Sequence, residues 1–216
     1  MIKTVIFDMD GVIVDTEPVH KYAYNLHFNE LNIEVSEELY SSFTGNSTKN
    51  VFQKLKKIYD LQQDIEALVL RKRHLFNEAF DTKEDLFLIE GVEDLIKNLY
   101  KTNYQLILAS SASNDTINRV FNRFQLDNYF THKVSGEDFP KSKPDPAIFL
   151  HAASLSLFSN ENCVVIEDST NGVVAAKAAG LKCIGYKSKN SKNQDLSKAD
   201  FIISDFIELN NHAIFS

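Results

Sequence analysis

Two pairs of carboxylates follow short apolar runs in this sequence. Asp8 and Asp10 form the first pair, and Glu167 and Asp168 form the second. Residues two apart in an extended chain point the same way, so Asp8 and Asp10 should project together. Like charges at such close range need a compensating cation, and hard oxygen ligands favour Mg²⁺. The pattern predicts a magnesium site. Solvated loop aspartates would also explain the first pair, and Asp168 alone could instead cap a helix.

Two further segments carry groups that suit a phosphate. Ser110, Ser111 and Ala112 follow an apolar run and precede a helical pattern. A hydroxyl and backbone N–H groups at a helix N-terminus bind phosphate, although serines there can also serve only as caps. Lys143 precedes Pro144, whose ring stiffens the following turn and would aim the lysine in a fixed direction. A lone lysine is usually solvated, so its meaning depends on the other groups.

Strand-like and helical patterns alternate along most of the chain. Apolar, β-branched runs predict strands at residues 3–7, 105–109, 132–135, 163–166, 182–186 and 201–204. Helical patterns lie between them at 92–100, 114–124, 147–155 and 172–179. This order predicts an α/β fold with a Rossmann-like, mostly parallel sheet covered on both faces. Active sites of such sheets lie at the carboxyl ends of the strands, where the groups described above would meet.

The long stretch between the first two predicted strands breaks this alternation. It carries apolar residues at helical spacing over residues 17–31, 48–59 and 62–80, and nothing in it resembles a strand. We therefore expect an inserted, all-helical cap subdomain at residues 15–85. The core would consist of residues 1–14 and 86–216, and the cap would cover the site.

The composition of the chain argues against several kinds of partner and against a disulfide-bonded fold. The chain has 216 residues and a formal net charge of −7, which disfavours nucleic acid and anionic membranes as partners. Cys163 and Cys183 are too few for a disulfide framework and lie in apolar runs, which predicts reduced core residues. Aspartates interrupt the apolar N-terminal stretch, and no run approaches the ~20 apolar residues of a membrane span. We expect a cytoplasmic protein, a monomer or weak homodimer.

Four motifs occur in order, each at a predicted strand end. They are FDMDGVIVDT (residues 7–16), AS (109–110), SKP (142–144) and EDSTNG (167–172). In combination they resemble the haloacid dehalogenase superfamily of phosphotransferases. The similarity is to the branch with a helical cap that contains β-phosphoglucomutase and many small-metabolite phosphatases. The resemblance covers essentially the whole chain.

The resemblance implies a role for each matching residue. Asp8 would be the nucleophile that becomes an aspartyl phosphate, and Asp10 the general acid and base. Ser110 would bind the transferring phosphoryl group, with the N–H groups of Ser111 and Ala112 nearby. Asp10 would need a proton near neutral pH, and neighbouring negative charge or a closed cap could raise its pKa enough.

Charge compensation is implied in the same way. Lys143 would neutralise the nucleophile and the phosphate. Glu167 and Asp168 would complete a Mg²⁺ site together with the Asp8 carboxylate and the backbone carbonyl of Asp10. A cation and a lysine would offset the repulsion between the nucleophile and a phosphate dianion.

The start of the cap matches the mutase pattern. Thr16, Glu17 and His20 leave the first motif and enter the first cap helix. The resemblance implies that His20 helps to position Asp10, although a partly buried helix histidine would look the same in the sequence. All three would face the substrate.

The cap loop departs from the mutase. Gly45 and Asn46 lie in a polar loop, flanked by Thr44 and Thr48 where the mutase carries a lysine and an arginine. That arginine holds the second phosphate of the mutase substrate, and a bisphosphate needs such a cationic clamp. Lys49, Arg71 or Arg73 could substitute, but none stands at the matching position. We therefore expect a phosphatase for a small metabolite, a sugar or polyol monophosphate, with a β-phosphoglucomutase-like phosphomutase as the alternative.

Two proteins without this activity share some of these features. A phosphorelay receiver domain also combines a phospho-accepting aspartate with a hydroxyl and a lysine, but in another order and without a helical insertion of this size. A non-catalytic phosphate-binding protein on the same fold would be expected to lose a nucleophile or a metal carboxylate, and Asp8, Asp10, Lys143 and Asp168 are all present.

Overall fold

A six-stranded parallel sheet forms the centre of the molecule. The computed structural model describes residues 1–43, 46–189, 193–209 and 213–215. The strands lie in the order β3-β2-β1-β4-β5-β6, and every neighbouring pair is parallel. Their bounds are β1 Thr4–Phe7, β2 Gln105–Ser110, β3 His132–Ser135, β4 Cys163–Glu167, β5 Lys182–Tyr186 and β6 Phe201–Ile203. The predicted α/β fold with a parallel sheet is confirmed.

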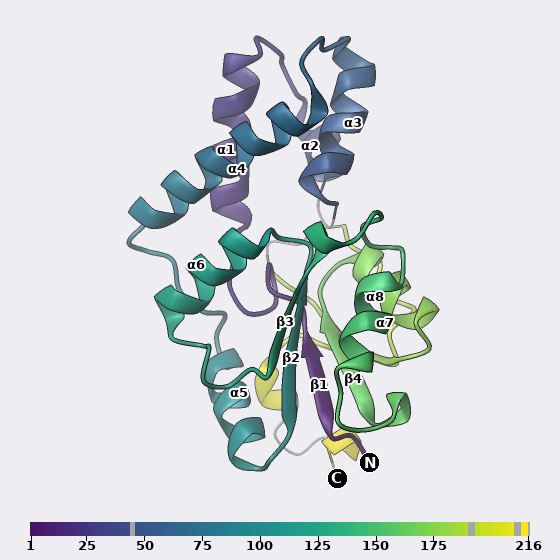
Figure 1. The fold of residues 1–216 in the computed structure, drawn as a ribbon. Coiled ribbons are helices and arrows are strands. Elements are labelled where there is room, and N and C mark those ends of the chain that lie inside the picture. Colours follow the sequence, from purple (N-terminus) through teal and green to yellow (C-terminus); the bar gives the residue numbers. More distant parts are fainter. Residues whose placement is uncertain (44–45, 190–192, 210–212, 216) are drawn as a thin grey trace.

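Helices cover both faces of the sheet (Figure 1). Helices α5 (Val92–Lys101) and α6 (Asn114–Phe124) lie on one face, and α7 (Ala147–Ser154) and α8 (Thr170–Ala178) on the other. Successive side chains of β1 point to opposite faces of the sheet, because side chains alternate along a strand. Val5 and Phe7 pack with residues of α5 and α6, whereas Ile6 packs with residues of α7 and α8. This burial on both faces explains why the strands read as continuous apolar runs.

Four helices between β1 and α5 form the cap, beyond the carboxyl edge of the sheet (Figure 1). They are α1 Glu17–Glu30, α2 Glu37–Ser41, α3 Thr48–Tyr59 and α4 Ile65–Thr82. The cap has a hydrophobic cluster of its own, which includes Phe52 and Leu55. Phe76 and Phe80 near the end of α4 belong instead to the cluster of the core. The boundaries at residues 15 and 85 stay a prediction.

Two cap elements differ from the expectation. The sequence pattern did not reveal α2, which is too short to show a helical period. Helix α4 begins at Ile65 rather than at residue 62 because the Asp64 side chain caps it, accepting from the N–H groups of Glu66 and Ala67.

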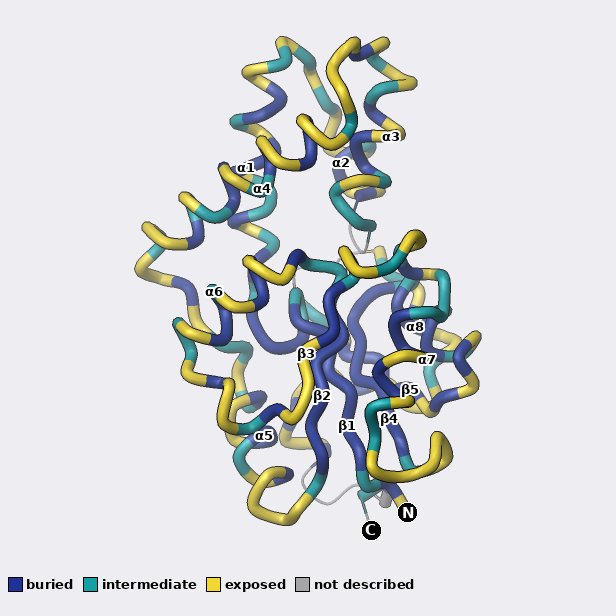
Figure 2. The backbone as a smooth tube through the Cα atoms, viewed as in Figure 1, coloured by how far each residue is buried: buried dark blue, intermediate teal, exposed yellow. Residues whose placement is uncertain are grey.

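Burial follows the division into layers. The strands at the centre of the sheet are buried along their length, and the cap helices are exposed on their outward faces (Figure 2). Cys163 and Cys183 are buried, free thiols, as predicted. Among the described helices, none combines the length and the apolar character required to cross a membrane.

Candidate active site

The register of β1 against β4 brings the two carboxylate motifs to one place. Phe7 pairs with Ile166, so that Asp8 and Glu167 leave the sheet side by side, and the N–H of Asp8 donates to the Ile166 carbonyl at 3.0 Å. Asp8, Glu167 and Asp168 are all buried, and each offers a carboxylate oxygen within 4.8 Å of the others. Three buried carboxylates this close need positive charge nearby.

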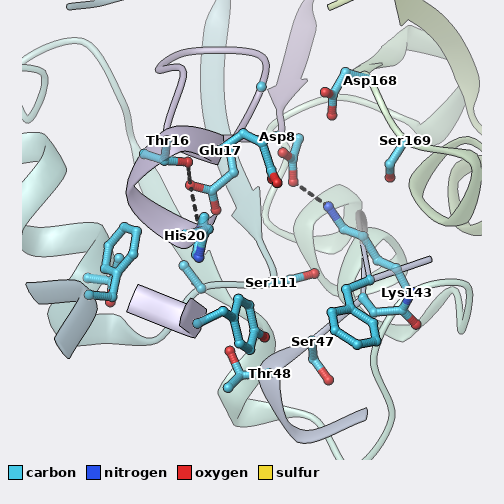
Figure 3. Close-up of a pocket in the computed structure, with 18 of the residues that line it drawn as sticks. Asp8, Thr16, Glu17, His20, Ser47, Thr48, Ser111, Lys143, Asp168 and Ser169 are labelled. Carbon is cyan, nitrogen blue, oxygen red and sulfur yellow. Dashed lines mark hydrogen bonds and ion pairs between the residues drawn. The ribbon is translucent and has the colours of Figure 1, made fainter. Parts of the chain in front are cut away.

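Lys143 supplies part of that charge. Its Nζ lies 2.5 Å from an Asp8 oxygen and 2.8 Å from a Glu167 oxygen, and it donates to the Ala109 carbonyl at 3.0 Å. The side chain is only 2% exposed. Burial alone would lower the pKa of Lys143, but the Asp8 and Glu167 carboxylates raise it above its ordinary value. The lysine is therefore a fixed cation aimed at Asp8 (Figure 3).

The cluster of carboxylates carries more negative charge than one lysine can neutralise. Burial raises the pKa of Asp8 to about 8; Lys143 opposes this shift and Glu167 adds to it. A cation bound among these oxygens would favour the ionised form of Asp8. The side-chain donors gathered here are carboxylate oxygens, which suit a hard divalent ion such as Mg²⁺.

Two glycines leave room for these carboxylates. A Cβ on Gly11 would lie 2.1 Å from an Asp168 oxygen, and one on Gly172 would lie 1.7 Å from a Glu167 oxygen. Gly11 also has a φ of +84°, a conformation that favours glycine. The backbone is thus shaped around the acidic side chains, and the residues present fit a metal ion held by Asp8, Glu167 and Asp168. The N-cap residue of α8 is Ser169, whose hydroxyl accepts from the Gly172 N–H.

Asp10 lies in a polar setting of its own. The Thr16 hydroxyl donates to its carboxylate at 2.5 Å, and Nε2 of His20 lies 3.8 Å away. Burial would raise the pKa of Asp10, but His20 and Thr16 outweigh that effect and hold the pKa below its ordinary value. The direction is opposite to the raised pKa that we expected. It follows from hydrogen bonds that the sequence does not reveal.

Ser110 and Ser111, at the end of β2, lie in different surroundings. Ser110 is the last residue of β2 and fully buried, and its hydroxyl accepts from the Ala112 N–H at 3.1 Å. Ser111 is the first residue beyond the strand, and it lines the cavity next to Asp8. Of these two serines, Ser111 is the one that lines the cavity, and the phosphate-binding role expected of Ser110 stays a prediction. Ser113 caps α6, because its hydroxyl accepts from the N–H of Thr116.

A cavity of about 130 Å³ lies between these groups and the cap. Thr16, Glu17 and His20 line it from α1 and its approach, and Asn46, Ser47 and Thr48 line it from the start of α3. Ser47 and Thr48 lie across the cavity from Asp8 (Figure 3). The expected residue Gly45 and its neighbour Thr44 lie outside the described residues. The small volume suits a small metabolite.

Glu17 is held in this cavity by an aromatic residue. The Tyr40 hydroxyl donates to its carboxylate at 2.9 Å. Both residues line the cavity, together with the rings of Tyr24, Phe43 and Phe76. Carboxylate and phenol oxygens beside aromatic rings suit a substrate body that carries hydroxyl groups.

Lys72 is a cavity residue that we did not predict. It is 2% exposed, and its Nζ lies 2.6 Å from Nδ1 of His20 and 4.5 Å from the ring centre of Tyr24. Burial lowers the pKa of Lys72 to about 7, although the carboxylates of Asp10 and Glu17 act in the other direction. The sequence does contain a signal for its burial, because Lys72 stands four residues after Leu68 and so lies on the same, buried face of α4. A lysine within an apolar helical stripe needs a reason to be there.

The other cationic side chains considered for the cap occupy three different places. Lys49 pairs with Glu66 and Arg71 pairs with Glu30, and neither cation lines the cavity. Arg73 does line the cavity and pairs with a carboxylate of the core.

The chain is similar to known proteins over most of its length. The family model described as haloacid dehalogenase-like hydrolase matches residues 5–186. A phosphorylated carbohydrates phosphatase of Thermotoga maritima is 31% identical over 186 residues, 84% of this chain and 83% of the relative. The β-phosphoglucomutase of Bacillus subtilis is 28% identical over 208 residues, 93% of this chain and 88% of the relative.

Solved structures are also similar to this chain over nearly its whole length. CbbY from Rhodobacter sphaeroides in complex with xylulose-(1,5)bisphosphate matches with a TM-score of 0.86 at 26% identity, over 97% of each chain. A β-phosphoglucomutase from Clostridium difficile matches with a TM-score of 0.83 at 25% identity, over 98% of this chain and 94% of the other.

Proposed function

The chain belongs to the haloacid dehalogenase-like hydrolase family, and we propose that it is a magnesium-dependent phosphatase for a sugar or polyol monophosphate. The observation that carries the proposal is the contact of Lys143 with Asp8, beside Glu167 and Asp168 at one edge of the sheet. The similarity to the named carbohydrate phosphatase supports the substrate class.

Asp8 is the proposed nucleophile. One of its oxygens attacks phosphorus, the bond from phosphorus to the ester oxygen breaks, and the phosphoryl group remains on Asp8. Asp10 gives a proton to the departing oxygen. In the second displacement Asp10 takes a proton from water and the water oxygen attacks phosphorus. The bond from phosphorus to the Asp8 oxygen breaks, which restores the carboxylate and releases inorganic phosphate. Two displacements with in-line positioning make each step easier than direct hydrolysis.

The setting of Asp10 bears on both steps. The Thr16 hydroxyl and His20 favour the ionised carboxylate, which is the form that accepts a proton from water. In the first step Asp10 must hold a proton. The negative charge of an arriving phosphate acts to raise the pKa of Asp10 at that stage.

Asp8, Glu167 and Asp168, together with the backbone carbonyl of Asp10, would hold Mg²⁺. When bound, the ion would neutralise charge on the phosphoryl oxygens. Lys143 contributes to the same neutralisation and keeps Asp8 oriented. Ser111, which lines the cavity, is a further proposed hydroxyl for binding the transferring group.

A phosphomutase similar to β-phosphoglucomutase is the second candidate, and the similarity to that enzyme favours it. The cap argues for hydrolysis instead. Thr48 lines the far side of the cavity with a hydroxyl, and Lys49 is paired with Glu66 away from it. A hydroxyl at this position, in place of the arginine of the mutase, suits a substrate with one phosphate.

Phosphate release from a panel of sugar and polyol monophosphates tests the proposal. The panel should include β-glucose 1-phosphate, with glucose 6-phosphate measured in parallel. We expect release from a few monophosphates, loss of activity in EDTA, recovery with Mg²⁺, and no turnover by Asp8→Asn. Glucose 6-phosphate without free phosphate would favour the mutase, and full activity in EDTA would remove the metal from the proposal.

A further inference from the structure

Arg73 and Glu137 form an ion pair across the gap between cap and core. Nη1 of Arg73 in α4 donates to Oε1 of Glu137 at 3.1 Å. The other oxygen of Glu137 accepts from the N–H of Asn114, the first residue of α6, at 2.7 Å. Glu137 is therefore anchored from the core side, whereas Arg73 reaches it from the cap.

The position of Arg73 gives this pair a consequence for substrates. Arg73 lines the cavity and stands next to Lys72 on α4. An arginine guanidinium binds phosphate through paired, charge-assisted hydrogen bonds, so an unpaired Arg73 would attract a second phosphate group. Paired with Glu137, its charge is already compensated.

The anchoring of Glu137 strengthens this effect. The side chains of Arg73 and Glu137 are 28% and 34% exposed, so the pair is partly solvated and a strong anion could compete for the arginine. Because the Asn114 N–H holds Glu137 in place, the carboxylate would remain beside Arg73 and repel a second phosphate that approaches the guanidinium. Glu17 adds another negative charge inside the cavity.

We propose that Glu137 determines specificity by neutralising Arg73, and so restricts the site to substrates that carry one phosphate. The inference rests on the proposed function, because it assumes that the cavity receives the body of a phosphorylated metabolite. Glu137 itself touches neither the nucleophile nor Asp10 and takes no part in the chemistry.

Binding to a variant that cannot turn over tests the inference. In an Asp8→Asn background, the dissociation constants of fructose 6-phosphate and fructose 1,6-bisphosphate are measured by calorimetry with and without Glu137→Gln. Glutamine keeps the shape of the side chain and can still accept from the Asn114 N–H. We expect the bisphosphate to bind about 10-fold tighter or more after the change, and the monophosphate to change less than about 2-fold.

Glu30→Gln is the matched control. It removes the same charge and releases Arg71, two residues from Arg73 on the same helix but outside the cavity. It should leave both dissociation constants unchanged. The inference is overturned if Glu137→Gln brings no gain for the bisphosphate, if both ligands gain equally, or if both lose affinity, as expected of a contact that only holds the cap closed. A wild-type chain that releases no phosphate from any monoester would refute the proposed function but leave this comparison of affinities intact.

Discussion

Lys143→Met isolates the role of the buried cation at the site. The change keeps a side chain of similar length and removes the charge that contacts Asp8 at 2.5 Å, Glu167 at 2.8 Å and the Ala109 carbonyl at 3.0 Å. Loss of one partner leaves two buried carboxylates without their closest compensation. The pKa of Asp8 should rise above about 8, so that the carboxyl favours its protonated form still more strongly.

The expected cost is large. Removing one partner of a buried ion pair costs about 3–5 kcal/mol of the free energy of unfolding. For a chain of this size, 1 kcal/mol corresponds to about 2–4 °C in melting temperature, so a fall of about 6–20 °C is expected. The kcat for a monophosphate should fall by about 10²–10³-fold, because a fixed charge at the transferring phosphoryl group is lost.

Thermal unfolding followed by circular dichroism at pH 7 measures the stability. Scans in EDTA and in Mg²⁺ separate the lysine from the metal, since Mg²⁺ should restore part of the lost stability. Lys177→Met is the control: Lys177 pairs with Asp200 at 2.6 Å, but the two side chains are 33% and 35% exposed. An exposed pair contributes about 0–1 kcal/mol. Equal losses in the two variants would refute the reasoning.

Two further predictions follow from the same geometry. Gly11→Ala should lower both the melting temperature and the Mg²⁺ affinity, because its Cβ would collide with the Asp168 carboxylate. Gly180→Ala is the control: its φ is also positive but nothing lies within 4 Å of the added Cβ, so it should show backbone strain without loss of Mg²⁺ affinity. Equal Mg²⁺ affinity in the two variants would contradict this prediction. Lys72→Met should lower activity yet stabilise the fold at pH 7 by on the order of 1–3 kcal/mol. The pKa of Lys72 is about 7 when folded against 10.5 when unfolded, so the wild type gains stability as pH rises between these values, and the advantage of the variant should shrink toward pH 10.5. Urea unfolding at several pH values measures that difference, and a constant difference would contradict the burial argument.

The fold could be predicted because its signals are local. Each strand is a run of apolar, β-branched residues, and burial on both faces of a parallel sheet requires that pattern. The cap was visible as a break in the alternation. Helix α2 was missed, since five residues cannot display a helical period.

The parts of the site that escaped prediction depend on three-dimensional contacts. Ser110 and Ser111 look alike in the sequence, and only the structure shows that Ser110 is buried at the end of β2 while Ser111 lines the cavity. Lys72 was overlooked because lysine is almost never fully buried, so a lysine in a helical pattern is normally taken for a surface residue.

Other features of the site join elements that are distant in the chain. Arg73 and Glu137 are 64 residues apart, so their ion pair has no local signature. The lowered pKa of Asp10 depends on where the Thr16 hydroxyl and the His20 ring come to lie.

The central place of β1 in the sheet has a consequence for the growing polypeptide. β1 is synthesised first, but its two neighbours, β2 and β4, begin at Gln105 and Cys163. Asp8 meets Lys143 across 135 residues. A nascent chain that ends before β4 carries Asp8, the proposed nucleophile, without Glu167 and Asp168 and without a neighbouring strand on one side of β1. Contacts of such long sequence separation form late and slowly. Phosphoryl transfer would therefore begin only when most of the chain has left the ribosome, and a truncated product would carry an exposed strand rather than partial activity.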